Sequence, residues 1–428
     1  MFSRHVTRST STRWRHGRWG AGVCSVFGAL TILSTGLTYG AAAADAQSQQ
    51  WYLSAMKTDE MWKVSTGKGV KVAVIDTGVN PDTPSLRGQV LVDETPKDLA
   101  HKATEDYVGH GTTMAELIAG TGAGGGLKGV APDAKIVPYR IALTGPEVTS
   151  PVKNAPDVAD VIRAVADSDV KIISMSFENH GEDEDELEAI KYAHSKGKLM
   201  IAAAGNDAEK KSLIGYPAAY PYVVGVAATD ESGKAAKFSE HGNYIDLAAP
   251  GLDMPGWCDE TFKAYCDQGG TSAATALTSA SAALIWSAHP DWTANQVLNS
   301  LIDTAGRDWA RDDPSTYLGY GLIRPRKVLE DEAYDPGPAN TDPLAKENAT
   351  GVLDEAGDPV AASSTAPSAD PSKDAKDSKE TSDGQAPAAA SDPETTDDTA
   401  LWVILGAAAA VLALGGGAFA VYRSRRRA

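Results

Sequence analysis

The sequence has little positive charge and few histidines. Its 39 lysines and arginines are outnumbered by 57 aspartates and glutamates, which gives a formal net charge of -18. Nucleic-acid binding requires a basic surface, so this composition argues against a nucleic-acid partner. The 8 histidines include no HExxH motif and no other spacing typical of metal ligands. We therefore predict no metal site and no required cofactor, and the sequence does not decide whether structural calcium is bound.

The first 46 residues are typical of a signal peptide. Five arginines between Arg4 and Arg18 precede an apolar run over residues 21–40. The small residues of AAAADA then supply a cleavage site near Ala44 or Ala46. We therefore expect the mature protein to be exported.

The other end of the sequence is typical of a membrane anchor. Residues 400–422 are almost entirely apolar and, as a helix, are long enough to cross a bilayer, whereas residues 423–428 carry four arginines. Basic flanks favour the cytoplasmic side, and the alternative is an apolar core helix. We predict a single-pass plasma-membrane protein with a cytoplasmic C-terminus and its main domain outside.

Residues 331–399 have the composition of a disordered linker. They contain 17 acidic residues, 4 lysines and almost no large apolar side chains. Such a segment cannot bury enough apolar surface to fold. One globular domain, residues 47–330, is left to carry the function.

Short, β-branched apolar segments alternate with helical patterns in this domain. Two segments, 157–169 and 184–197, have the length and periodicity of crossover helices. The predicted strands are buried on both faces and cover residues 70–76, 135–141, 170–177, 198–205 and 222–229. This alternation predicts an α/β fold with a mostly parallel, doubly wound sheet, in which sites form at the carboxyl ends of strands.

Four polar residues lie at such ends or at helix starts. Asp76 closes a strand in VAVIDTGV, His110 begins a helical run in GHGTTMAELIAG, and Asn206 follows a strand in AAAGND. Ser272 begins a helix of small residues in GGTSAATA, where Thr271 and Ser272 are good start residues. Each residue also has an ordinary interpretation, as a turn former, a helix-start residue, a loop residue or a helix cap.

In order and local motif these four segments resemble the subtilisin-like serine proteases, or subtilases, over about residues 65–325. The resemblance implies a three-layer fold and a serine endopeptidase that acts on proteins or peptides. It implies that Ser272 is the nucleophile, that His110 is the general base, and that Asp76 orients His110. Asn206 and the backbone amide of Ser272 are then expected to hold the oxyanion.

Several positions depart from the subtilase pattern. The resemblance assigns substrate binding to Ser176, Phe177, Glu178 and Gly205, but the family's Ser-Leu-Gly-Gly reads Ser-Phe-Glu-Asn here. Glu178 either favours a basic substrate residue or is a solvated charge at the rim of the cleft. Glu116 stands where glycine or alanine is usual, and Ala276 replaces a proline, which we expect to loosen the helix start.

The whole architecture resembles the mycosins, membrane-anchored subtilases associated with type VII secretion. This resemblance implies the secretion machinery as a partner. It leaves open a second function, that of a weakly active or inactive protease-fold scaffold. Only about 29 residues separate the predicted cleavage site from Asp76, too few for a folded propeptide, so we expect the segment 47–62 to pack against the domain.

Two of the three cysteines, Cys258 and Cys266, belong to the exported domain, whereas Cys24 lies in the leader. An oxidising compartment favours pairing the first two as a disulfide just before Ser272. Free thiols are the alternative.

Overall fold

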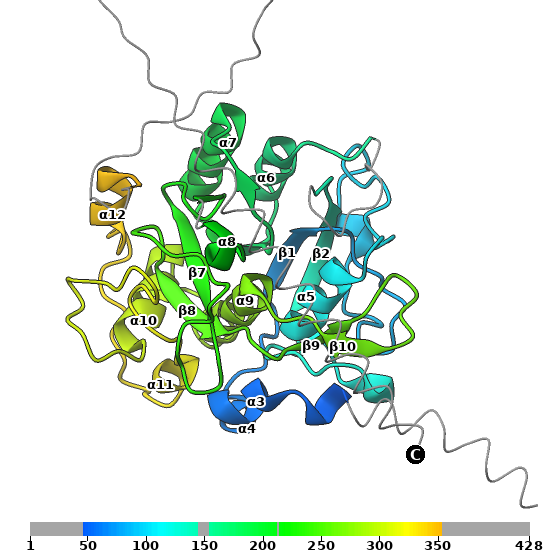
Figure 1. The fold of residues 1–428 in the computed structure, drawn as a ribbon, viewed down its shortest axis with the longest axis horizontal. Helices are drawn as coiled ribbons and strands as arrows, with labels where there is room; N and C mark the ends of the chain where they lie inside the picture. Colours follow the sequence, from blue (N-terminus) through cyan, green and yellow to red (C-terminus); the bar gives the residue numbers. More distant parts are fainter. Residues whose placement is uncertain (1–45, 144–153, 212–213, 353–428) are drawn as a thin grey trace, which may run out of the picture. The chain divides into compact units, whose positions relative to one another are not determined.

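The computed structural model describes residues 46–143, 154–211 and 214–352. Its centre is a six-stranded sheet with the order β2-β1-β3-β5-β7-β8, in which every pairing is parallel (Figure 1). The five predicted strands are all present, and β8 is an additional one. The strands are β1 (Lys71–Asp76), β2 (Lys135–Arg140), β3 (Ile172–Met175), β5 (Leu199–Ala203), β7 (Val223–Thr229) and β8 (Leu247–Pro250).

Helices cover both faces of this sheet. Val72 and Val74 of β1 belong to the core shared with α9, whereas Ala73 and Ile75 belong to the core shared with α6 and α7. This alternation follows from the two-residue period of a strand. The predicted three-layer α/β fold is confirmed. One layer contains α5 (His110–Ala119), α9 (Thr271–Ala288), α10 (Ala294–Thr304) and α11 (Pro325–Leu329), and the other contains α6 (Val158–Ala166) and α7 (Glu184–Ser195).

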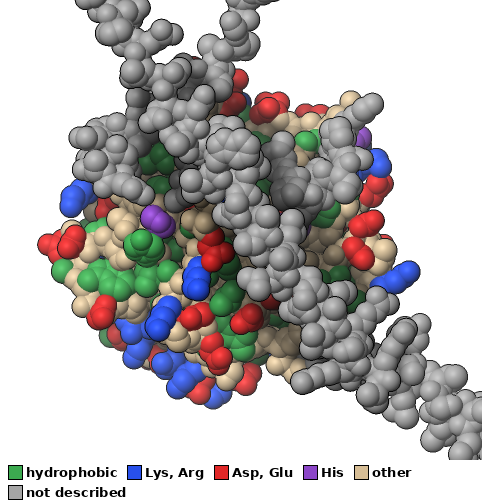
Figure 2. Space-filling model, viewed as in Figure 1, with side chains coloured by type: hydrophobic (Ala, Val, Ile, Leu, Met, Phe, Trp, Pro, Cys, Tyr) green, Lys and Arg blue, Asp and Glu red, His purple; other side chains and the backbone are tan. Residues whose placement is uncertain are grey.

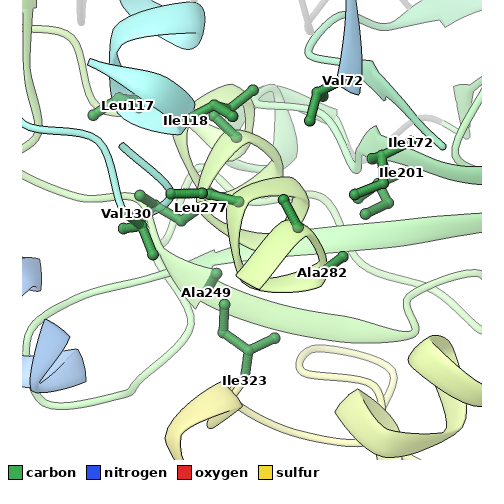
Figure 3. Close-up of a cluster of buried hydrophobic side chains, with 14 of the residues drawn as sticks. Val72, Leu117, Ile118, Val130, Ile172, Ile201, Ala249, Leu277, Ala282 and Ile323 are labelled. Carbon is green, nitrogen blue, oxygen red and sulfur yellow. The ribbon is translucent and has the colours of Figure 1, made fainter. Parts of the chain in front are cut away.

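Helix α9 is the central helix of its layer. Figure 3 shows its residues Leu277 and Ala282 surrounded by side chains of the sheet and of α5. The buried hydroxyl groups of α9 have acceptors; Thr278, for example, donates to the carbonyl of Ala274 at 2.8 Å. Because small residues allow close approach and these hydroxyls are satisfied, α9 can pack against β1, β3, β5, β7 and β8.

The N-terminal segment packs against the domain, as expected. It contains α3 (Trp51–Met56) and α4 (Thr58–Met61). The Gln50 amide both donates to and accepts from the backbone of Lys128, at 2.8 and 2.9 Å. The Trp62 indole donates to the Val130 carbonyl at 2.8 Å, and Tyr52 is completely buried.

The chain beyond residue 330, where we predict the linker to begin, also packs against the domain up to residue 352. Leu344 is buried, and short helix α12 (Ala345–Thr350) contributes Asn348, whose side chain accepts from the Tyr222 amide at 2.8 Å. Two side chains of α10 bond carbonyls in this segment: Gln296 donates to Gly337 and Asn299 donates to Pro336, each at 2.9 Å. Composition alone pointed to disorder, but hydrogen bonds from distant helices hold these residues.

The remaining elements are short. Two antiparallel pairs of short strands are present: β4 (Asn179–His180) pairs with β6 (Gly215–Tyr216), and β9 (Pro255–Trp257) forms a hairpin with β10 (Tyr265–Asp267). Single-turn helices are η1 (Val92–Glu94), η2 (Ala123–Gly125) and α8 (Ala208–Lys211). On the face drawn in Figure 2, acidic and basic side chains are interspersed, and Lys and Arg gather along its lower edge.

No helix among the described residues is both long and apolar enough to cross a membrane. The predicted transmembrane helix 400–422, the tail 423–428, residues 1–45 of the predicted signal peptide and residues 353–399 of the predicted linker lie outside the described residues.

Candidate active site

Asp76 and His110 form a close pair at the carboxyl edge of the sheet. Asp76 is the last residue of β1 and is fully buried, and His110 is the first residue of α5, with 23% of its side chain exposed. The His110 Nδ1 lies 2.7 Å from Asp76 Oδ1, which also accepts the Thr77 amide at 2.7 Å. A carboxylate bonded to Nδ1 favours the tautomer that carries its proton there. The arrangement therefore leaves Nε2 as a proton acceptor.

Close backbone contacts bring the start of α5 onto the end of β1. Gly78 has φ +108°, and a Cβ at this position would lie 2.7 Å from the Glu105 carbonyl oxygen. A Cβ at Gly111 would lie only 2.2 Å from the Gly78 carbonyl oxygen. Only glycines fit this approach, and Gly78 turns the chain sharply after β1.

Asp106 organises the loop before His110, and sequence reasoning missed it. Its Oδ1 accepts from the Thr77 hydroxyl and the Gly109 amide, and its Oδ2 accepts from the amide and hydroxyl of Thr112. Burial raises the pKa of Asp106, and the hydrogen bonds from Thr112 and Thr77 oppose that rise. In the sequence Asp106 is an ordinary turn residue, and only its contacts show that it positions the histidine.

Ser272 lies in the first turn of α9, which begins at Thr271 with Gly270 as its cap. Gly270 provides no side-chain cap, so the expected capping by Thr271 or Ser272 does not occur. The Ser272 hydroxyl donates to the Ser176 carbonyl at 2.9 Å, and the Ser176 hydroxyl donates to the Ser272 carbonyl at 3.1 Å. These two bonds attach the first turn of α9 to the segment that follows β3.

Strand register brings the two halves of the site together. Ile75 of β1 pairs with Met175 of β3, so the next residues, Asp76 and Ser176, leave the sheet from neighbouring parallel strands. Neighbouring strands lie about 4.8 Å apart. Asp76 holds His110 and Ser176 holds Ser272, and helix α5 packs against α9. A carboxylate, an imidazole and a hydroxyl are thus gathered at one edge of the sheet.

Asn206 lies beside the start of α9 and is exposed. Its Oδ1 accepts from the Thr271 amide at 2.9 Å and from the Thr271 hydroxyl at 3.1 Å. Because both of these groups donate, the side-chain atom that faces them is the oxygen. The Nδ2 group of Asn206 therefore points away from Thr271. The Ser272 amide lies in a helical first turn, where it has no acceptor within the helix. Both groups can therefore donate to a developing negative charge.

Two of the predicted substrate-binding residues, Glu178 and Gly205, lie beside Asn206. Phe177 is buried, whereas Glu178 is half-buried and its Oε1 accepts from the backbone N–H of Asn206 at 3.4 Å. Glu178 Oε2 is buried and has no hydrogen-bond partner among the described residues. Gly205, at φ +119°, lies directly against Glu178 Oε2. Glu178 is therefore not a fully solvated charge.

Glu116 is a buried structural carboxyl group. It accepts from the Thr83 hydroxyl and from the Tyr265 hydroxyl, each at 2.8 Å. Burial raises the pKa of Glu116 to about 7, and the hydrogen bond from Thr83 is the largest opposing effect. Ala276 is also fully buried, and α9 runs without interruption from Thr271 to Ala288, so the expected loosening of the helix start is not seen.

Cys258 and Cys266 are thiols on diagonal positions of the β9–β10 hairpin. Desolvation and a hydrogen bond to Cys266 raise the pKa of the Cys258 thiol to about 11. The two sulfur atoms are thus neighbours, and the disulfide stays a prediction.

The described residues include one group of three potential metal ligands, Glu178, His180 and Asp207, whose ligand atoms lie within 4.8 Å of one another. His180 is exposed and the other two are half-buried. Exposed acidic groups often lie together without an ion, so we assign no metal to this group.

Comparison with known proteins gives consistent matches over the domain. The subtilase family model matches residues 67–321. Subtilisin BL of Lederbergia lenta is 32% identical over 267 residues, which cover 61% of this chain and 92% of that protein. The minor extracellular protease Epr of Bacillus subtilis is 31% identical over 295 residues, which cover 67% of this chain but only 42% of Epr.

Among solved structures, the MycP3 protease from the type VII (ESX-3) secretion system is similar, with a TM-score of 0.54 and 27% identity. The match covers 65% of this chain and 87% of MycP3. The family match over residues 67–321, more than half of the chain, agrees with the observed fold. This chain therefore belongs to the subtilase family of serine endopeptidases and is mycosin-like.

Proposed function

We propose that this chain is an extracytoplasmic, membrane-anchored serine endopeptidase in which Asp76, His110 and Ser272 form the catalytic triad. One observation carries the proposal. The β1–β3 register supports it, because Asp76, bonded to His110, and Ser176, bonded to Ser272, directly follow the paired residues Ile75 and Met175. The sequence order Asp, His, Ser agrees with the subtilase order.

The geometry supports a two-step acyl transfer. The Ser272 hydroxyl turns from the Ser176 carbonyl to His110 Nε2, which takes its proton as the Ser272 Oγ bonds to the substrate carbonyl carbon. Asp76 stabilises the imidazolium that forms. The proton then passes to the leaving amine as the peptide C–N bond breaks, and water hydrolyses the acyl-enzyme by the same route. Asn206 Nδ2 and the Ser272 amide donate to the oxyanion in both steps.

Fluorophosphonate labelling tests this proposal. The full-length protein in detergent should be labelled covalently, and the Ser272→Ala variant should neither be labelled nor cleave peptides. Ser232→Ala, at an exposed loop serine, is the matched control and should behave like wild type. A wild-type protein that is not labelled under conditions where subtilisin reacts would contradict the proposed triad.

The proposed location rests on the sequence of the two ends. A leader with five arginines and an apolar run supports export, and the apolar segment 400–422 followed by four arginines supports a single span with a cytoplasmic tail. Ala46 is buried against the core, which favours cleavage after Ala44. Protease added to intact cells should release the domain. Cleavage of the C-terminal tail from outside the cell would show that the proposed orientation is wrong.

A scaffold role in a type VII secretion complex is the second candidate, and the similarity to MycP3 favours considering it. The two roles separate in cells that carry Ser272→Ala. Loss of substrate processing with an assembled complex supports the enzyme. Complete rescue of a deletion strain by Ser272→Ala supports the scaffold.

A further inference from the structure

Two carboxyl groups converge beside the proposed nucleophile. A Cβ placed on Gly205 would lie 1.9 Å from Glu178 Oε2 and 2.4 Å from Glu240 Oε2. Glu240 is completely buried, and its backbone amide donates to the Gly205 carbonyl at 2.9 Å. The two carboxylate oxygens therefore converge on the space where a Cβ of residue 205 would lie, and any side chain at this position would collide with both.

These carboxyl groups lie next to the reacting atoms. Gly205 directly precedes Asn206, and the backbone N–H of Asn206 donates to Glu178 Oε1. Gly205 itself donates through its amide to the hydroxyl of Thr271, the residue before Ser272. A peptide whose carbonyl is held by Asn206 and Ser272 thus places its nearest side chain close to this pair of carboxyl groups.

The local charge favours a cation at this place. No lysine or arginine of the described residues forms an ion pair with Glu178; the third carboxyl group nearby, Asp207, is itself paired with the exposed Lys210 at 2.8 Å. Burial and, less strongly, Asp207 raise the pKa of Glu178, whereas the Asn206 amide and His180 lower it. A bound ammonium or guanidinium group would offset this like-charge repulsion and pair with the buried Glu178 Oε2.

We propose that Glu178, with Glu240 behind it, makes this enzyme select substrates with lysine or arginine immediately before the scissile bond. The proposal rests on the proposed peptidase function and adds the class of substrate. A long cationic side chain reaches the carboxylates, whereas an apolar side chain leaves Glu178 Oε2 buried without a partner.

The test uses full-length protein in detergent and peptides that differ only at the residue before the cleaved bond. Lysine and its uncharged analogue norleucine form the decisive pair. The kcat/KM ratio of lysine to norleucine should exceed about 10 in wild type, and Glu178→Gln, which keeps the shape, should lower the ratio about 10- to 100-fold. Glu178→Asp keeps the charge and should retain a preference for lysine. Glu60→Gln, at an exposed glutamate of α4, is the control for a lost charge elsewhere.

The outcomes separate the two proposals. If Ser272 is labelled and peptides are cleaved, but norleucine is preferred or Glu178→Gln leaves the ratio unchanged, the specificity proposal is wrong and the peptidase proposal stands. If neither labelling nor cleavage occurs, both are wrong. If EDTA abolishes the lysine preference and Ca²⁺ restores it, Glu178 serves a metal ion and the specificity proposal is also wrong.

Discussion

Two carboxyl groups meet helix α5 in different ways. Asp76, at the carboxyl end of β1, bonds to the side chain of His110, which is the first residue of α5. Glu116 lies within the helix and accepts hydrogen bonds from the hydroxyl groups of Thr83 and Tyr265. Both side chains are buried, so burial alone does not distinguish a chemical role from a structural one.

The partners of each carboxyl group make the difference. In the proposed mechanism His110, held by Asp76, takes the proton of the half-buried Ser272 and passes it to the leaving amine, whereas Thr83 and Tyr265 hold Glu116 with hydroxyl groups that do not titrate near neutral pH. We therefore expect substitutions at the sheet edge to change the rate of reaction with little change in stability. Substitutions around Glu116 should change stability with little change in rate.

Asp76→Asn should have the largest effect on rate. Asparagine preserves the shape but favours the wrong tautomer of His110, so we expect kcat/KM to fall about 10⁴-fold. Steady-state cleavage of a lysine peptide measures the loss, and thermal unfolding verifies that the fold is intact. Activity within tenfold of wild type would mean that Asp76 does not orient the base.

Asn206→Ala should lower kcat about 100- to 1000-fold with little change in KM, the size of effect measured for an oxyanion-hole asparagine in subtilisin. Asn206→Asp tests the oxyanion role more directly. Its carboxylate can still accept from Thr271, but the variant lacks the Nδ2 donor. Its kcat should fall at least as far. If Asn206→Asp retains wild-type kcat, the bond to Thr271 is what matters and the oxyanion role is wrong.

Glu116→Gln should alter how stability depends on pH. The pKa of Glu116 in the folded state, about 7, lies above its ordinary value of 4.5, so the folded protein keeps a proton that the unfolded chain releases between these values. The free energy of unfolding is therefore highest below pH 4.5 and falls by about 3 kcal/mol as the pH rises to about 7. Above pH 7 this contribution no longer changes. Denaturant unfolding should show this loss in wild type and a smaller one in Glu116→Gln.

The difference between the two proteins is the quantity to compare, because Glu186 also contributes. Burial raises the pKa of Glu186 to about 7, and this group is unchanged in the variant. Parallel pH profiles for wild type and Glu116→Gln would show that Glu116 does not titrate as inferred. Peptide cleavage at constant temperature should differ by less than tenfold between them.

The Cys258–Cys266 disulfide should have the smallest effect. Tyr265, the partner of Glu116, lies on the same hairpin, so a disulfide would stiffen the structural region. Closing a nine-residue loop corresponds to roughly 2.5 kcal/mol in the chain-entropy model. Non-reducing peptide mapping of the exported protein should find the two cysteines joined, and the double serine variant should unfold earlier yet still cleave. Recovery of two free thiols would remove this prediction.

The sequence alone predicted five of the six strands of the sheet, the two crossover helices and all four residues gathered at the proposed site. These features are local. A buried parallel strand requires a continuous apolar run, a crossover helix requires its own periodicity, and Asp76, His110, Asn206 and Ser272 each lie within a short motif. The order of the motifs along the chain was sufficient to indicate the family.

Only the tertiary structure decided what surrounds these residues. Asp106 bonds to Thr77, 29 residues away, and Glu240 converges with Glu178 on Gly205; these contacts join residues far apart in the chain. The fold also holds residues 331–352, which by composition alone appear unable to fold, through hydrogen bonds from α10. Pairings between distant segments depend on strand register and packing, and no local pattern encodes them.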